Sequence, residues 1–151
     1  MNLLDETLNH TTNGSKPKAG KWTIIVQVHE LRGIKSQFGS GGIPRPVIHV
    51  NVWDQTKIIN PKTQGFECKI EMSGKISIEM TEDEIDSGQI LISIVDKHLF
   101  SSSHIGAYNF DISDLHARTN HEYYVKWFAL TDTKSNPPRR TAQSLNQSRT
   151  V

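Results

Sequence analysis

Residues 89–112 read QILISIVDKHLFSSSHIGAYNFDI, and this stretch decides the fold class. Ile90, Ile92 and Ile94 point to one side of an extended chain, and Leu91 makes the other side apolar as well. A strand that is apolar on both faces is typical of the centre of a sheet. The polar run KHLFSSSH then predicts a loop, and IGAYNFDI predicts the next strand. A glycine near the start of that strand favours a β-bulge or a close approach of another segment.

The same alternation recurs on both sides of this stretch. WTIIVQVHEL, PVIHVNVW, KISIEM and YYVKWFALTD each predict a strand with at least one buried face. TKII and FECKI predict shorter strands, but the register between Asp54 and Gly74 stays open. TEDEIDSG is interpreted as an acidic connection, and SDLHARTNHE as a short helical turn with Ser113 as its N-cap. Seven to eight short strands with almost no helix indicate an all-β antiparallel sandwich or barrel.

Composition and polarity divide the chain into three parts. Residues 1–20 are polar and predict a flexible arm, residues 21–132 form the predicted domain, and residues 133–151 predict a basic tail or linker. The net charge of +1 over 151 residues argues against binding nucleic acid by bulk charge. Cys68 is the single cysteine, so no internal disulfide is expected. No apolar run approaches the ~20 residues of a membrane-spanning helix.

The second half of the domain resembles the C2 domains of ferlins. The residues that carry the resemblance are Val95-Asp96 before a loop, Ile105-Gly106 after it, Phe110-Asp111-Ile112, His121, Lys126-Trp127 and Leu130-Thr131-Asp132. The resemblance covers roughly residues 22–132. It implies an eight-stranded C2-type β-sandwich with three loops at one end, which in many C2 domains bind calcium and then lipid headgroups. Trp127, on the closing strand, is expected in the core.

Calcium binding is not expected, and no cofactor is predicted. A calcium ion takes about six to eight oxygen ligands, mostly clustered carboxylates. Arg45 stands where the resemblance implies an aspartate, and the loop from Arg32 to Pro46 contains no acidic residue. The last loop offers only Asp96, which is the residual calcium-ligand candidate. The seven histidines do not have zinc-site spacing with the lone cysteine.

Two surfaces are candidates for binding. The first consists of loop residues that combine apolar and cationic side chains: Arg32, Ile34, Lys35, Phe38, Arg45, Lys97, Leu99 and Phe100. These residues suit the interface of an anionic bilayer, and the alternative for the apolar ones is that they fold back and plug the end of the sandwich. The second is a basic face of Lys57, Lys62, Lys69 and Lys75. Glu67 and Glu71 dilute its charge, so scattered surface lysines are the competing interpretation.

These features favour a non-catalytic module over an enzyme, since no nucleophile or phosphate-loop motif is present. The main hypothesis is calcium-independent, peripheral binding to anionic phospholipid membranes in vesicle trafficking or fusion. The alternative is a scaffolding domain that binds a protein partner within a larger, membrane-tethered ferlin-like chain. We expect a monomeric domain in the cytoplasm, at the cytosolic face of membranes.

Overall fold

The structure, a computed structural model, describes residues 17–35, 42–124 and 127–131. Its elements are the strands β1 (Gly20–Leu31), β2 (Pro46–Val52), β3 (Gln55–Ile59), β4 (Cys68–Met80), β5 (Gln89–Lys97) and β6 (Ser102–Asp111), the helices α1 (Glu82–Ser87) and α2 (Ile112–Ala117), and the 3₁₀ turn η1 (Thr119–His121). The expected arm and tail fall almost wholly outside the described residues, as do Phe38, Lys126 and Asp132.

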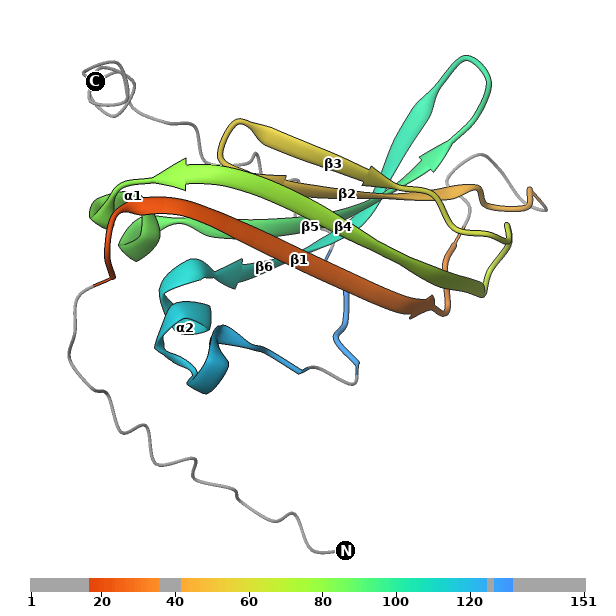
Figure 1. Ribbon diagram of the computed structural model, residues 1–151. Coiled ribbons are helices and arrows are strands. Elements are labelled where there is room, and N and C mark those ends of the chain that lie inside the picture. The colour runs from red at the N-terminus through yellow and green to blue at the C-terminus, as the bar shows by residue number, and fades with distance from the viewer. Residues whose placement is uncertain (1–16, 36–41, 125–126, 132–151) are drawn as a thin grey trace, which may run out of the picture.

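The described strands form two antiparallel sheets that face each other (Figure 1). One sheet has the order β3-β2-β5-β6, and the other consists of β1 and β4. The expected all-β antiparallel sandwich is confirmed. Six of the expected strands are described as strands, and the predicted closing strand contributes an isolated bridge between Thr131 and Ala107 of β6.

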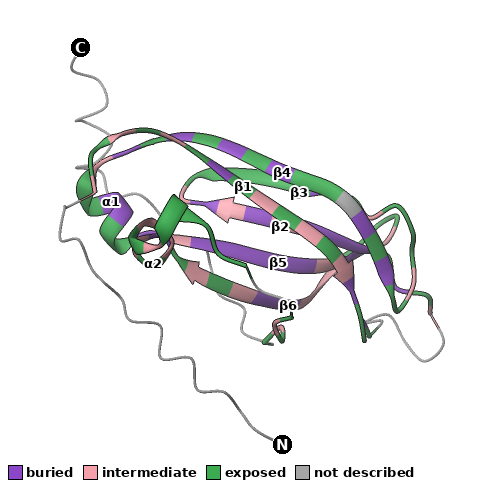
Figure 2. Ribbon diagram, turned by 60° about the horizontal axis from the view of Figure 1, so that its bottom comes forward, coloured by how far each residue is buried: buried purple, intermediate pink, exposed green. Residues whose placement is uncertain are grey.

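The core lies between the two sheets and is built mainly from isoleucine and valine. Ile48, Ile59, Ile70 and Ile94 are at most 1% exposed, and burying a side chain of this size stabilises the fold by roughly 1.5–3 kcal/mol. β5 is buried along almost its whole length, as Figure 2 shows, and it lies between β2 and β6. Its predicted place in the centre of a sheet is therefore confirmed.

The register that the sequence left open is fixed by two contacts. β3 pairs with β2 so that Ile59 lies opposite Ile48. FECKI and KISIEM, predicted as separate strands, are parts of the continuous β4, because Gly74 continues the extended chain. A Cβ atom at Gly74 would lie 3.0 Å from Ile59 Cδ1 and 3.3 Å from Lys57 Cγ. The glycine therefore lets β3 pack closely against β4.

The predicted bulge near Gly106 is confirmed. Ile94 pairs with Gly106 and Val95 with His104, so Ile105 is the extra residue. A Cβ atom at Gly106 would lie 2.8 Å from Leu130 Cβ. The glycine thus also permits the close approach of the segment that ends at Thr131.

The end of the sandwich opposite the long loops carries the two short helices (Figure 1). The acidic connection is the helix α1, whose capping box joins Thr81 and Glu84: Glu84 N–H donates to Thr81 Oγ1 at 3.2 Å, and Thr81 N–H donates to Glu84 Oε2 at 2.9 Å. Ser113 was wrong as the N-cap of the second helix, since α2 starts one residue before it and Asp111 is the N-cap.

Trp127 corrects another expectation, because it is 58% exposed and lies outside the core. The guanidinium of Arg32 stacks over its ring at 4.7 Å from the centroid. Between β1 and the residues 122–124 and 127–130 runs a groove of about 1350 Å³. Among the described residues, β1 pairs only with β4, so its other edge faces this groove.

Candidate functional site

Three connections meet at one end of the sandwich. β1 ends at Leu31 opposite the first residue of β4, β2 begins at Pro46 opposite Asp96, and β3 ends beside the start of β2. The connections that follow β1, β3 and β5 therefore lie at the same end, at the right of Figure 1. The arrangement implied by the family resemblance is present.

The β5–β6 connection is a hairpin that projects beyond the other two. His98 N–H donates to Ser101 O at 2.9 Å and closes the tip. At this tip Leu99 is 85% exposed and Phe100 is fully exposed. The alternative that these side chains plug the sandwich end is wrong, because they lie beyond the last strand pair, Lys97 with Ser102.

Ile34 behaves in the opposite way. It is 4% exposed and belongs to the core, so it is not available as the predicted membrane contact. Its N–H donates to the carbonyl of Phe66 at 3.1 Å, which draws the residue under the β3–β4 loop. Two apolar loop residues were missed by sequence reasoning: Ile43 is 63% exposed and Phe66 54%. Their position beside glycine and proline in loops was the available signal.

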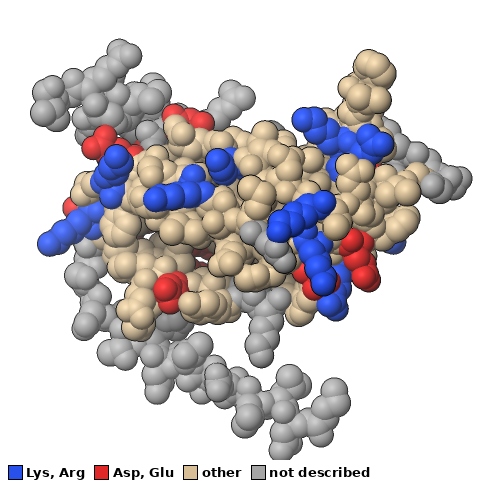
Figure 3. Space-filling view, turned by 45° about the vertical axis from the view of Figure 1, so that its right-hand side comes forward, with Lys and Arg blue, Asp and Glu red and all other residues tan. Residues whose placement is uncertain are grey.

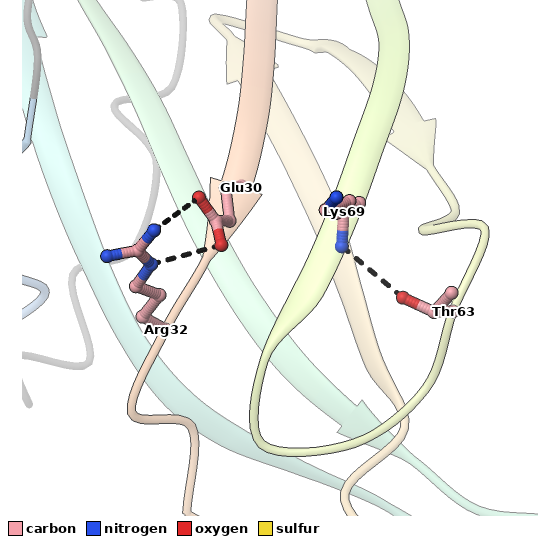
Figure 4. A network of polar contacts seen from close by, with 4 residues as sticks. All are labelled: Glu30, Arg32, Thr63 and Lys69. Atoms are coloured by element: carbon pink, nitrogen blue, oxygen red, sulfur yellow. Dashed lines mark hydrogen bonds and ion pairs between the residues drawn. The ribbon is translucent and has the colours of Figure 1, made fainter.

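The predicted loop cations differ in their surroundings. Arg32 makes two 3.0 Å contacts with the carboxylate of Glu30, which Figure 4 shows together with the nearby contact between Lys69 N and Thr63. The hydrogen bond to Arg32 lowers the pKa of Glu30 and raises the pKa of Arg32. Arg32 is thus an ion-pair partner, not the lipid-attracting charge that was predicted. Lys35, Arg45 and Lys97 are exposed.

Asp96 is an internal support and not a surface ligand. It is 0% exposed, and its Oδ1 accepts a 2.8 Å hydrogen bond from Arg45 N–H and lies 3.1 Å from His98 Nε2. Its role as a residual calcium ligand is therefore not supported, because the carboxylate is engaged inside the protein. Within the described ranges no group of three or more His, Cys, Asp or Glu residues is placed to hold a metal ion. That calcium is not needed stays a prediction.

The basic face is only partly assembled. Lys57, Lys62, Lys69 and Lys75 are all exposed. Lys57 packs its stem beside Gly74, next to Lys75, whereas Lys69 lies opposite Glu30 on β1 and contributes to the lowered pKa of that carboxyl. Lys62 lies in the β3–β4 loop. The four lysines are thus spread over one side and one end of the domain.

A shallow pocket of about 360 Å³ lies beside the hairpin. Its polar lining residues are Arg45, Asn60, Thr63, Gln64, Lys97 and His98. Figure 3 shows Lys and Arg side chains gathered at the base of the hairpin projection at the upper right. Sequence reasoning missed Asn60, Thr63 and Gln64, because their contribution depends on how the β3–β4 loop folds over the start of β2.

In the part of the chain that the structure describes, no helix is long and apolar enough to cross a membrane. No protein-family model matches the sequence.

The chain is 25% identical over 122 residues to Ferlin 1 of Toxoplasma gondii, an alignment that covers 75% of this chain and 9% of Ferlin 1. It therefore spans about a tenth of the length of that relative. The A-named C2 domain of RIM from Drosophila superposes with a TM-score of 0.51 at 13% identity, over 64% of this chain and 89% of that domain. The A-named C2 domain of plant Extended Synaptotagmin 1 matches with a TM-score of 0.48 at 13% identity, over 65% and 72%. The sandwich is of the C2 type.

Proposed function

We propose that this C2 domain, whose resemblance to those of ferlins is confirmed by the match to Ferlin 1, binds anionic phospholipid membranes peripherally and without calcium. As a C2 domain it is a membrane- or protein-interaction module. The observation that carries the more specific proposal is the exposure of Leu99 and Phe100 at the hairpin tip. We place its role in vesicle trafficking or membrane fusion, at the cytosolic face of membranes, with no catalytic step.

The energetics favour docking through this tip. Removing a leucine or phenylalanine side chain from water is worth roughly 1.5–3 kcal/mol. Lys35, Arg45 and Lys97 are exposed on the same end of the domain, and each cation near an anionic surface adds about 1 kcal/mol. These gains together suit reversible, peripheral binding.

The tip is also held in place before it meets a membrane. β5 and β6 pair as far as Lys97 and Ser102, and the hydrogen bond between His98 and Ser101 closes the loop. A preformed hairpin loses less conformational entropy on binding than a flexible loop. The two apolar side chains are therefore presented as one unit.

The case for calcium independence rests on the same end of the domain. Asp96 is buried and bonded to Arg45 N–H, and the neighbouring side chains of Arg45 and Lys97 are cationic. A divalent cation would meet two positive charges and a carboxylate that is already engaged. The positive side chains take over the attraction to anionic lipid that a bound ion supplies elsewhere.

Liposome co-sedimentation tests the proposal. The wild-type domain is expected to pellet with vesicles that contain anionic lipid, equally in calcium and in a chelator, and the double variant Leu99→Ser/Phe100→Ser is expected to stay in the supernatant. The control Ile25→Ser/Met72→Ser removes two residues that are 65% and 51% exposed on the outer face of the β1–β4 sheet, and is expected to pellet normally. Pelleting that requires calcium would overturn the calcium-independent mechanism.

Protein interaction is the second candidate, and the groove beside β1 favours it. The free edge of that strand faces apolar core residues, among them Ile92 and Ile94, and exposed edges accept additional strands. A domain that pellets with no vesicle of any composition would favour this scaffolding function over membrane binding.

A further inference from the structure

The pocket beside the hairpin has a construction suited to an anion. Arg45 and Lys97 lie side by side, because Pro46 pairs with Asp96 and Lys97 N–H donates to Arg45 O at 3.0 Å. Both side chains line the pocket and both residues are exposed. Among the described residues that line it there is no carboxylate.

The structural contacts of the two cationic residues involve their backbones. Arg45 uses its N–H toward Asp96 and its carbonyl toward Lys97 N–H. The backbone positions of both residues are thereby fixed by the buried Asp96 and by the strand pairing, while the guanidinium and the ammonium project from the rigid base. Such an arrangement positions two charges for an anion at little entropic cost.

The opposite wall is the β3–β4 loop, which is tied down at several points. Gly65 N–H donates to Pro44 O at 3.0 Å, and Phe66 O accepts from Ile34 N–H. Thr63 Oγ1 accepts a 3.3 Å hydrogen bond from Lys69 N–H, which holds a hydroxyl at this wall. The side-chain amides of Asn60 and Gln64 add donors to the same wall.

We propose that this pocket binds the phosphate of a phosphomonoester headgroup, such as that of phosphatidic acid. The inference rests on the proposed membrane function, because Leu99 lines the pocket and also belongs to the exposed tip. A phosphomonoester carries more charge and more unsubstituted oxygens than a phosphodiester, so it matches two cations and several donors better. With the phosphate in the pocket, Phe100 extends from the neighbouring tip toward the acyl region.

Vesicle composition provides the first test. Vesicles with phosphatidic acid are compared with phosphatidylglycerol vesicles adjusted to the same surface charge. The wild-type domain is expected to prefer phosphatidic acid by about tenfold, which corresponds to about 1.4 kcal/mol. Arg45→Gln and Lys97→Gln are each expected to lose this preference, while Lys75→Gln, which removes the same charge on the exposed face of β4, is expected to keep it. Equal binding of wild type to both vesicles would overturn headgroup recognition.

A soluble probe separates the pocket from the membrane. Glycerol 3-phosphate, titrated against glycerol at matched ionic strength, is expected to shift the NMR signals of the Thr63 and Lys97 amides. Leu99→Ser/Phe100→Ser is expected to retain these shifts even though it no longer binds vesicles. If wild type shows the shifts but binds no vesicle, the pocket recognises a free phosphate ester and the membrane function is wrong. If vesicles bind without any such shift, the pocket assignment is wrong and the membrane function stands.

Discussion

The carboxylate of Asp96 accepts a 2.8 Å hydrogen bond from the backbone N–H of Arg45. It joins the end of the β1–β2 loop to the end of β5, two segments that are distant in the sequence. Because Asp96 is fully buried, water cannot replace the carboxylate as the acceptor. The residue that the sequence offered as a metal ligand thus holds the loop end together.

Replacement of Asp96 by alanine is expected to destabilise the domain by about 1–3 kcal/mol, because the buried amide of Arg45 loses its acceptor. Urea unfolding followed by tryptophan fluorescence measures the change. Glu67→Ala, at an exposed position of the β3–β4 loop, is the control and is expected to have little effect. A loss for Asp96→Ala that is no larger than for the control would contradict the supporting role.

The capping box of α1 gives a second prediction. Thr81→Ala removes the acceptor of the Glu84 amide and is expected to cost about 1 kcal/mol in urea unfolding. The matched control is Ser113→Ala, which lies inside the first turn of α2 and is not its N-cap; little change is expected there. The opposite order of effects would show that the caps are assigned wrongly.

Acidification is expected to weaken the fold through His49 and His116. Burial is the main cause that lowers the pKa of both imidazoles; Lys97 lowers that of His49 further, and His121 lowers that of His116, against an opposing effect of Asp86. A histidine with a lowered pKa in the folded state takes up its proton more readily in the unfolded state. Stability is therefore complete above the ordinary pKa of about 6.5 and decreases as the pH falls toward the lowered values.

Urea unfolding at a series of pH values checks this expectation. His116→Gln is expected to reduce the pH dependence between about pH 7 and pH 5. His29→Gln, at an exposed position on β1, serves as the matched control. A slope that His116→Gln leaves unchanged would remove this residue from the explanation.

The single cysteine reports on the loop that forms one wall of the pocket. Cys68 is 1% exposed, its Sγ lies 3.3 Å from Gly65 O, and burial raises the pKa of its thiol. Because the thiolate is the reactive form, alkylation in the native state is expected to be orders of magnitude slower than in urea. Native and denatured rates that are alike would show that the β3–β4 loop does not protect the thiol.

The sequence predicted what strict alternation encodes and failed where tertiary contacts decide. β5 was predicted correctly because its isoleucines alternate without interruption. Ile34 and Leu99 look alike in sequence, as apolar residues within polar loops. One is buried because a carbonyl from a distant loop, that of Phe66, holds its amide, and the other is exposed because its hairpin projects. Neither contact is encoded locally.

The lining of the pocket was hidden for the same reason. Arg45 and Lys97 were singled out by charge, but Thr63 joins them only after β3 pairs with β2 and the following loop returns over Pro44. The register between Asp54 and Gly74 could not be fixed from the sequence, because a glycine and a proline interrupt the alternation. Without that register, the wall opposite the two cations could not be predicted.

Amide hydrogen exchange along β1 provides the last prediction. Every second amide of an edge strand points away from its neighbour, and within the described residues β1 has only β4 as a partner. Aromatic contacts bound the groove along its other edge: Trp22 packs edge-on against His116 and His121, and Arg32 stacks on Trp127.

We therefore expect the amides of β1 to alternate between slow exchange, where they bond to β4, and exchange that is orders of magnitude faster, where they face the groove. The central strand β5 is the internal control, because it is paired on both sides and its amides should be uniformly slow. Uniformly slow exchange along β1 as well would mean that a further strand pairs with it. The groove would then be part of the core, and the scaffolding function would lose the observation that favours it.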